Sequence, residues 1–225
     1  MKYFGEGLSE QHKELGKIVR KKDGFEAAVL LFLELHGKLH LSEISNGDLN
    51  EVDLLLNDIS PQAYYTMPTL KDETIAWALW HIARIEDLAM NILVGATEQI
   101  FDYNWKEKMN TPISDTGNAL TDDEIVSLSK NLCISELIAY RNAVGKRTQE
   151  IVKGLSAEDM KRKVSTKALE KIRVEGGVTE QANSIWLLDY WGKKDVAGIL
   201  LMPPTRHIIM HLNDCCKWKQ QIQVM

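Results

Sequence analysis

Long apolar runs are absent from this sequence, and that absence limits where the protein can reside. The longest candidate, from Ala27 to Leu33, is bounded by Glu26 and Glu34, whereas a helix that crosses a membrane needs about 18 apolar residues. The N-terminal residues scatter charges and lack the apolar stretch of a signal peptide. We therefore expect no membrane-spanning segment, no membrane partner, no export and a cytoplasmic location.

Cysteine and positive charge are also scarce. The three cysteines, Cys133 and the adjacent Cys215 and Cys216, form neither a disulfide framework nor a CxxC pair, which favours a reducing compartment. The 27 basic residues are outnumbered by 32 acidic ones, for a net charge of −5. Because this sign does not favour binding to phosphate backbones, we expect no nucleic-acid partner.

Motifs of several enzyme classes are missing. The sequence has no GxSxG elbow, no glycine-rich phosphate loop and no HExxH pattern, which argues against serine hydrolysis, nucleotide binding and zincin chemistry. It also has no alternating strand pattern of useful length. What it does have is 44% apolar and 26% charged residues in a chain of 225, enough for one sizeable core. These features predict an all-α protein.

Four segments carry apolar residues at the three- and four-residue spacing of amphipathic helices. They span residues 25–40, 71–94, 121–155 and 203–223. The second segment closes on Gly95, which is typical of a helix end, and the third opens with a Thr121–Glu124 capping pattern. Four helices of this kind predict a four-helix bundle.

The remaining segments lie outside these helices. Residues 1–24 are expected to form a helical N-terminal extension ahead of a domain spanning 25–225. Residues 97–119 contain proline, glycine and asparagine without sustained periodicity and predict an irregular excursion. Residues 156–200 predict one short helix at about 180–191.

His81 lies in the middle of the apolar stripe of the second helix. The stripe comprises Trp77, Ala78, His81, Ile85, Leu88 and Ile92. We expect the opposite face to be solvated, since it carries Glu73, Arg84, Asp87 and Asn91. His81 should therefore point into the core of the bundle.

The last helix carries His207 and His211, whose four-residue step places both imidazoles on one side. Three buried imidazoles need partners for their nitrogen atoms, and a divalent metal ion would supply one. Three protein ligands would also leave one coordination position open, as catalytic sites do. The HxxxH spacing alone leaves open the alternative of ordinary core histidines held by hydrogen bonds.

A second HxxxH step, His36 and His40, ends the first helix. Gly37 lies between the two histidines, so we expect a frayed, exposed helix end that binds no metal. Asp214 and Cys215 follow His211 closely and could add a fourth ligand, although ordinary helix positions are the commoner outcome.

Two stretches of the sequence carry a resemblance to a known family. They are Trp77-Ala-Leu-Trp-His81-Ile-Ala-Arg-Ile-Glu-Asp87 and Pro204-Thr-Arg-His207-Ile-Ile-Met-His211-Leu, and they resemble the DinB superfamily, also described as YfiT-like metal-dependent hydrolases. The resemblance implies a four-helix bundle with a long crossover. It also implies that His81, His207 and His211 bind one divalent ion, zinc or nickel first and iron third. It implies no catalytic side chain.

The resemblance also sets the functional expectation. Relatives in that family include thiol S-transferases and isomerases that use low-molecular-weight thiols, so we expect a metal-dependent enzyme, a hydrolase or a thiol transferase, with a small-molecule substrate. The alternative is a non-enzymatic protein that uses the ion as a staple or its surface to bind a partner. Trp80, expected on the exposed side of the second helix, suggests a homodimer.

Overall fold

The computed structural model describes residues 4–45, 47–70 and 72–224, and within these ranges it contains helices and no strand. The all-α prediction is confirmed. The helices are α1 (Leu8–Ile18), α2 (Phe25–Gly37), α3 (Glu51–Leu56), α4 (Pro61–Tyr65), α5 (Ile75–Asp87), α6 (Tyr103–Lys108), α7 (Asp122–Asn131), α8 (Ile134–Lys153), α9 (Thr166–Val174), α10 (Ala182–Gly192), α11 (Val196–Leu200) and α12 (Ile208–Gln223). None of the helices in these ranges is long and apolar enough to cross a membrane.

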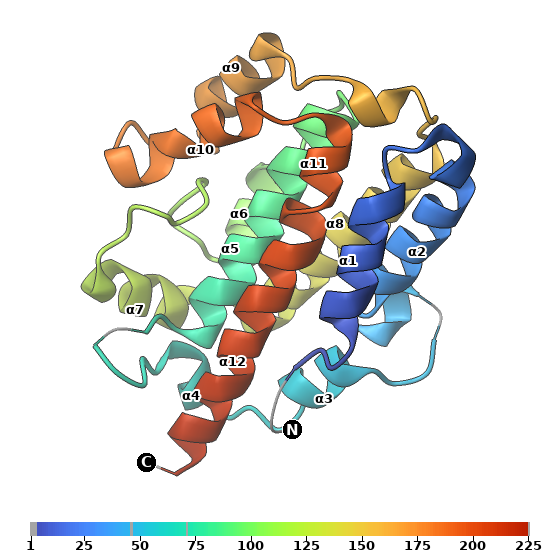
Figure 1. The fold of residues 1–225 in the computed structure, drawn as a ribbon. Helices are drawn as coiled ribbons and strands as arrows, with labels where there is room; N and C mark the ends of the chain where they lie inside the picture. Colours follow the sequence, from blue (N-terminus) through green and yellow to red (C-terminus); the bar gives the residue numbers. More distant parts are fainter. Residues whose placement is uncertain (1–3, 46, 71, 225) are drawn as a thin grey trace.

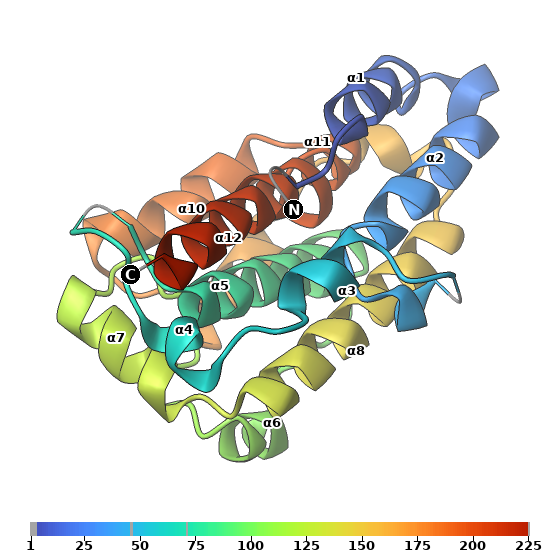
Figure 2. The ribbon, with the colours of Figure 1, turned by 90° about the horizontal axis from the view of Figure 1, so that it is seen from below.

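Helices α2, α5, α8 and α12 form the bundle (Figure 1). Helix α5 packs against both α8 and α12, and α2 packs against α8. Helices α5 and α8 run in the same direction, opposite to α2 and α12 (Figure 2). The chain between α5 and α8 must therefore return along the bundle, and this return is the long crossover that the resemblance implies.

Helix α5 is the innermost helix, which corrects one prediction. All 13 of its residues are buried, so the solvated face expected opposite His81 does not exist. Arg84 and Asp87 are fully buried and Asn91 is 1% exposed; only Glu73, which precedes the helix, is partly exposed. The helix starts after Thr74, whose hydroxyl accepts a hydrogen bond from the backbone N–H of Trp77.

The buried polar residues of α5 are tolerated because the crossover segment pairs with them. The Asp87 carboxylate accepts hydrogen bonds from the backbone N–H groups of Ile100 (2.8 Å) and Phe101 (2.9 Å). It also accepts from the Tyr140 hydroxyl at 2.6 Å and from the Arg84 guanidinium at 3.1 Å. A buried charge that is paired and fully hydrogen-bonded does not destabilise a core as a lone charge would.

Trp80 is also buried, with no exposed surface, and its indole Nε1–H donates to the carbonyl oxygen of Asp115 at 3.1 Å. The expectation of an exposed Trp80 is therefore wrong. The homodimer loses this support and stays a prediction.

The third predicted helix is two helices, α7 and α8. The capping pattern is confirmed, because Thr121 and Glu124 form a reciprocal capping box at the start of α7. Leu132 and Cys133 are extended, and the Cys133 backbone N–H donates to the Met109 carbonyl of the crossover at 3.0 Å. This long-range hydrogen bond takes the place of a helical one. The helix is therefore interrupted by a tertiary contact, and no glycine or proline marks the break in the sequence.

The other segments depart less from the sequence predictions. The second predicted helix ends in a π-helical turn, η3 (Leu88–Val94). The fourth begins in another, η5 (Pro203–His207). Residues 97–119 contain the short α6, and residues 156–200 contain α9, α10 and α11 where one helix was expected. Helix α1 packs against α2, with Leu8 and Leu15 buried in the common core.

Candidate metal centre

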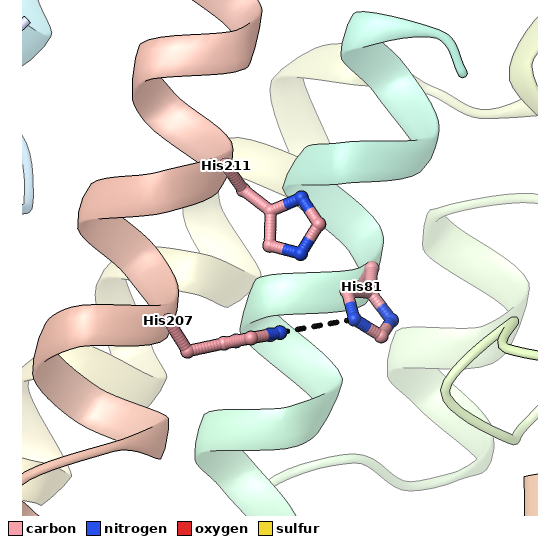
Figure 3. A group of neighbouring side chains, drawn as sticks. All are labelled: His81, His207 and His211. Carbon is pink, nitrogen blue, oxygen red and sulfur yellow. Dashed lines mark hydrogen bonds between the residues drawn. The ribbon is translucent and has the colours of Figure 1, made fainter. Parts of the chain in front are cut away.

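His81, His207 and His211 converge between α5 and α12 (Figure 3). The Nε2 atoms of His81 and His207 lie 3.1 Å apart, and one nitrogen from each of the three rings lies within 4.8 Å of the others. The ring centroids are 4.6 to 5.0 Å apart. The three histidines are the ones that the sequence places on inward-facing stripes.

The π-helical turn η5 sets the position of His207. Its backbone N–H donates to the carbonyl of Met202, five residues earlier, at 2.9 Å. Such a turn holds one more residue than an α-helical turn and often lies at a functional site. His207 is the last residue of η5 and His211 lies on the first turn of α12, so both imidazoles reach α5 from the same side.

A backbone carbonyl fixes the orientation of His81. The Nδ1 atom of His81 lies 2.7 Å from the carbonyl oxygen of Thr116. A carbonyl can only accept, so Nδ1 carries the proton and Nε2 keeps its lone pair, directed at His207 and His211. Metal-binding histidines are commonly oriented in this way.

This contact belongs to a set in which side chains of α5 donate to consecutive backbone carbonyls of residues 114–117. The pairs are Arg84 Nε with Ser114 (3.0 Å), Trp80 Nε1 with Asp115 (3.1 Å), His81 Nδ1 with Thr116 (2.7 Å) and Trp77 Nε1 with Gly117 (3.1 Å). Gly117 has a φ of +75°, and a Cβ there would lie 2.8 Å from the Trp77 indole nitrogen. Only glycine allows the loop this close to the helix.

Burial keeps the three imidazoles neutral. It lowers the pKa of His81 to about 3, with a further contribution from His211. It lowers the pKa of His211 to about 4, and that of His207 well below its usual value. At neutral pH each ring therefore has an unprotonated nitrogen, which is the form that binds a metal ion.

The donor set fits a divalent ion. Ligand atoms about 2.1 Å from a metal lie roughly 3.0 to 3.4 Å from one another, and the two facing Nε2 atoms are 3.1 Å apart. The Nδ1 atoms of His207 and His211 are buried and have no hydrogen-bond partner. Because no acidic side chain joins this group among the described residues, a cation would meet only neutral nitrogen ligands.

Asp214 and Cys215 do not supply a fourth ligand. Among the described residues, the group whose candidate ligand atoms lie within 4.8 Å of one another contains His81, His207 and His211 and neither of these two. Cys215 is fully buried, and burial raises the pKa of its thiol well above the usual value, so the thiol stays protonated. Both residues occupy ordinary helix positions.

A pocket of about 160 Å³ opens on the histidine group. His81 and His207 form part of its lining, and the rest comes from Ile85, Asn118, Trp186, Leu187, Tyr190, Trp191, Met202 and Pro203. Helix α10, which contributes the aromatic residues, corresponds to the short helix that the sequence predicts at about 180–191. The pocket therefore links the imidazoles to solvent and depends on residues that sequence reasoning did not assign.

The second HxxxH pair is not at an exposed helix end, which corrects another prediction. His36 and His40 are fully buried. Their Nε2 atoms lie 2.8 and 3.1 Å from the two carboxylate oxygens of Glu86, and the Thr148 hydroxyl donates to Glu86 at 2.7 Å. These three residues, His36, His40 and Glu86, could also hold a metal ion by their spacing. No motif or spacing in the sequence singles out Glu86.

Comparison with known proteins agrees with the fold and with the first of the two motifs. The sequence model of the DinB superfamily matches residues 48–181, a stretch that includes His81 and the 114–117 loop and ends before His207 and His211. No curated protein matches the sequence. Because the matched residues make up more than half of the chain, this protein belongs to the DinB superfamily.

Proposed function

We propose that the protein is a metal-dependent enzyme in which His81, His207 and His211 hold one divalent ion at the inner end of the pocket. The observation that carries the proposal is the facing of three neutral imidazoles with no anion among them. A divalent ion on three nitrogens acidifies a water or a thiol that reaches the remaining coordination position. Zinc and nickel are the first candidates and iron the third, since imidazole suits all three.

The chain itself would contribute three things. The Thr116 carbonyl fixes the His81 ring, burial keeps the imidazoles neutral, and the pocket admits one small molecule. Hydrolysis and thiol transfer are both compatible with these roles. The two differ in whether turnover of an ester or amide proceeds without an added thiol.

The alternative is a bundle that uses the ion as a staple. The pocket beside His81 and His207 favours the enzyme, because a staple needs no access from solvent. A cytoplasmic homodimer is also part of the proposal. Cys133, Cys215 and Cys216 form no disulfide, in keeping with a reducing compartment, and sedimentation at micromolar concentration tests the dimer.

The test is metal analysis of protein purified without a histidine tag, together with a variant pair. Wild-type protein should contain one ion per chain. His81→Ala should weaken binding at least about 100-fold, because it leaves two ligands on one helix, and should keep its helical circular dichroism because the core is large. The control is His12→Ala, since His12 lies outside the group and contacts the Leu201 carbonyl. One tightly held ion in His81→Ala would overturn the assignment.

A further inference from the structure

The wall of the pocket is aromatic and comes from one helix. Trp186, Tyr190 and Trp191 lie along α10 and line the pocket opposite His81 and His207. Trp191 is 1% exposed, whereas Trp186 is 45% exposed, so Trp191 lies inside and Trp186 lies at the opening. Such rings offer flat apolar surfaces for a ligand.

Charge is missing from the pocket. Apart from His81 and His207, whose imidazoles are neutral, none of the described residues that line it is acidic or basic. Lys194 lies 4.3 Å from the centre of the Tyr190 ring, but it does not belong to the lining. The proposed ion would neutralise one anionic atom at the head of a ligand, and a second charge on its body would lose water without gaining a partner.

Asn118 adds an amide group to the lining of the pocket. The side-chain oxygen of Asn118 accepts a hydrogen bond from the Thr116 hydroxyl at 2.6 Å. This bond fixes which way the amide faces and leaves its NH₂ group to donate to a ligand.

The size of the pocket limits the ligand further. Its volume of about 160 Å³ is close to that of an apolar cavity that accommodates one benzene molecule, about 150 Å³. A peptide-sized thiol with two carboxylates is both too large and too charged for it.

We propose that this site takes a small uncharged substrate, the size of one aromatic ring or a short chain, with a single metal-binding atom at one end and a hydrogen-bond acceptor near Asn118. The inference rests on the proposed function for the role of the ion. The aromatic wall and the missing charges, however, belong to the pocket alone and can be tested without a metal.

The first experiment uses cobalt-loaded protein and a matched pair of thiols, 2-mercaptoethanesulfonate and its neutral analogue 2-(methylsulfonyl)ethanethiol, with benzenethiol as the ring-sized probe. The absorption band of a cobalt-bound thiolate reports binding. The neutral sulfone and benzenethiol should half-saturate the band at least about tenfold below the sulfonate, because the sulfonate has no cation to pair with. Equal or tighter binding of the sulfonate would overturn the proposal.

The second experiment changes the wall at Trp186, whose exposure makes substitution tolerable. Trp186→Ala should weaken benzenethiol about tenfold through the lost ring contact, and Trp186→Phe should restore most of it. Trp186→Arg should narrow or reverse the preference against the sulfonate, because it places a cation at the opening. If all three variants bind both probes like wild-type protein, α10 does not form the site.

Metal-free protein separates this inference from the proposed function. Quenching of tryptophan fluorescence by methyl phenyl sulfone and by benzenesulfonate compares a neutral and an anionic ligand that need no ion. A preference for the neutral ligand supports the pocket even if the protein takes up no cobalt. Cobalt uptake without that preference, or a preference for the anion, would refute the pocket assignment while leaving the metal proposal intact.

Discussion

Helix α5 contributes one residue to each of two side-chain groups, and both groups contain an HxxxH step from another part of the chain. His81 joins His207 of η5 and His211 of α12, and Glu86, five residues later on α5, joins His36 of α2 and His40, which follows that helix. In each group the candidate ligand atoms lie within 4.8 Å of one another. By spacing alone the two groups are equivalent.

They differ in what already satisfies the imidazoles. In the Glu86 group the carboxylate accepts hydrogen bonds from both imidazole rings and from the Thr148 hydroxyl. The buried charge is therefore hydrogen-bonded without a metal ion. The Nδ1 atoms of His36 and His40 have no hydrogen-bond partner, which is also true of His207 and His211, so this feature does not separate the two groups. In the His81 group no anion is present and one ring is oriented by a carbonyl.

Arg141 adds to the contrast. Its guanidinium donates to the carbonyl oxygen of Leu39, next to His40. Burial lowers the pKa of His40 to about 3; the Glu86 carboxylate opposes this shift, and the positive charge of Arg141 adds to it. A divalent ion placed there would add to a cation already in the core. An HxxxH step alone therefore does not specify a metal site; the third residue and the charges around it matter as well.

The largest expected effect comes from removing the carboxylate. Glu86→Leu leaves two imidazole N–H groups and the Thr148 hydroxyl unpaired in the core, and should lower the free energy of unfolding by about 3–5 kcal/mol. Urea denaturation measures the loss, with Glu86→Gln as a milder control because its amide oxygen still accepts. The metal content of either folded variant should stay at the wild-type level. Loss of the metal would mean that the ion binds at the Glu86 group and not at the His81 group.

His36→Ala should destabilise the protein by about 2–3 kcal/mol, because it opens a cavity beside Phe32 and removes one hydrogen bond to Glu86. Metal binding should be unchanged. The sequence also predicts that His36 binds no metal, but a frayed, exposed helix end would give little loss of stability. Metal analysis and urea denaturation of the same preparation test both parts of the prediction.

Acid should weaken the metal-free protein. The pKa of His40 and of His81 is lowered from 6.5 to about 3, so the unfolded chain takes up protons below pH 6.5 while the folded protein does not until about pH 3. Stability is therefore lost as pH falls through this window, by about 2 kcal/mol per histidine at pH 5. Because both imidazoles of the folded protein are already unprotonated in this window, bound zinc should raise the stability without removing the acid-dependent loss due to either histidine, which thermal unfolding with and without zinc measures.

The smallest effect concerns the carbonyl that orients His81. Gly117→Ala should push the 114–117 loop away from Trp77, since a Cβ there meets the indole and the φ is positive. Metal affinity should fall about tenfold with little change in helix content. A matched substitution at Gly176, where φ is +71° and a Cβ meets nothing within 4 Å, should strain the backbone and leave metal affinity unchanged.

The inward direction of His81, His207 and His211 could be predicted because it is local: each histidine belongs to an apolar stripe on its own helix. The burial of Arg84 and Asp87 could not, because their partners Ile100, Phe101 and Tyr140 lie elsewhere in the chain. The same holds for His36 and His40. Glycine between two histidines suggested a weak helix end, and only Glu86, about fifty residues away, makes that end part of the core.

The break between α7 and α8 has the same explanation, since the Cys133 N–H is satisfied by Met109 of the crossover. The pocket wall on α10 could not be assigned from the sequence for a different reason. Its aromatic residues carry no spacing that distinguishes a ligand site from ordinary packing, so only the structure shows that they share a pocket with His81.

The pairing of α5 with residues 114–117 has a consequence for how the protein can vary. The four donors lie between Trp77 and Arg84, and their acceptors are four consecutive backbone carbonyls, those of residues 114–117. Because each carbonyl has its own donor on α5, an insertion or deletion between residues 114 and 117 would separate donors from their carbonyls. Changes in the length of the crossover should therefore be confined to the stretches before and after residues 114–117.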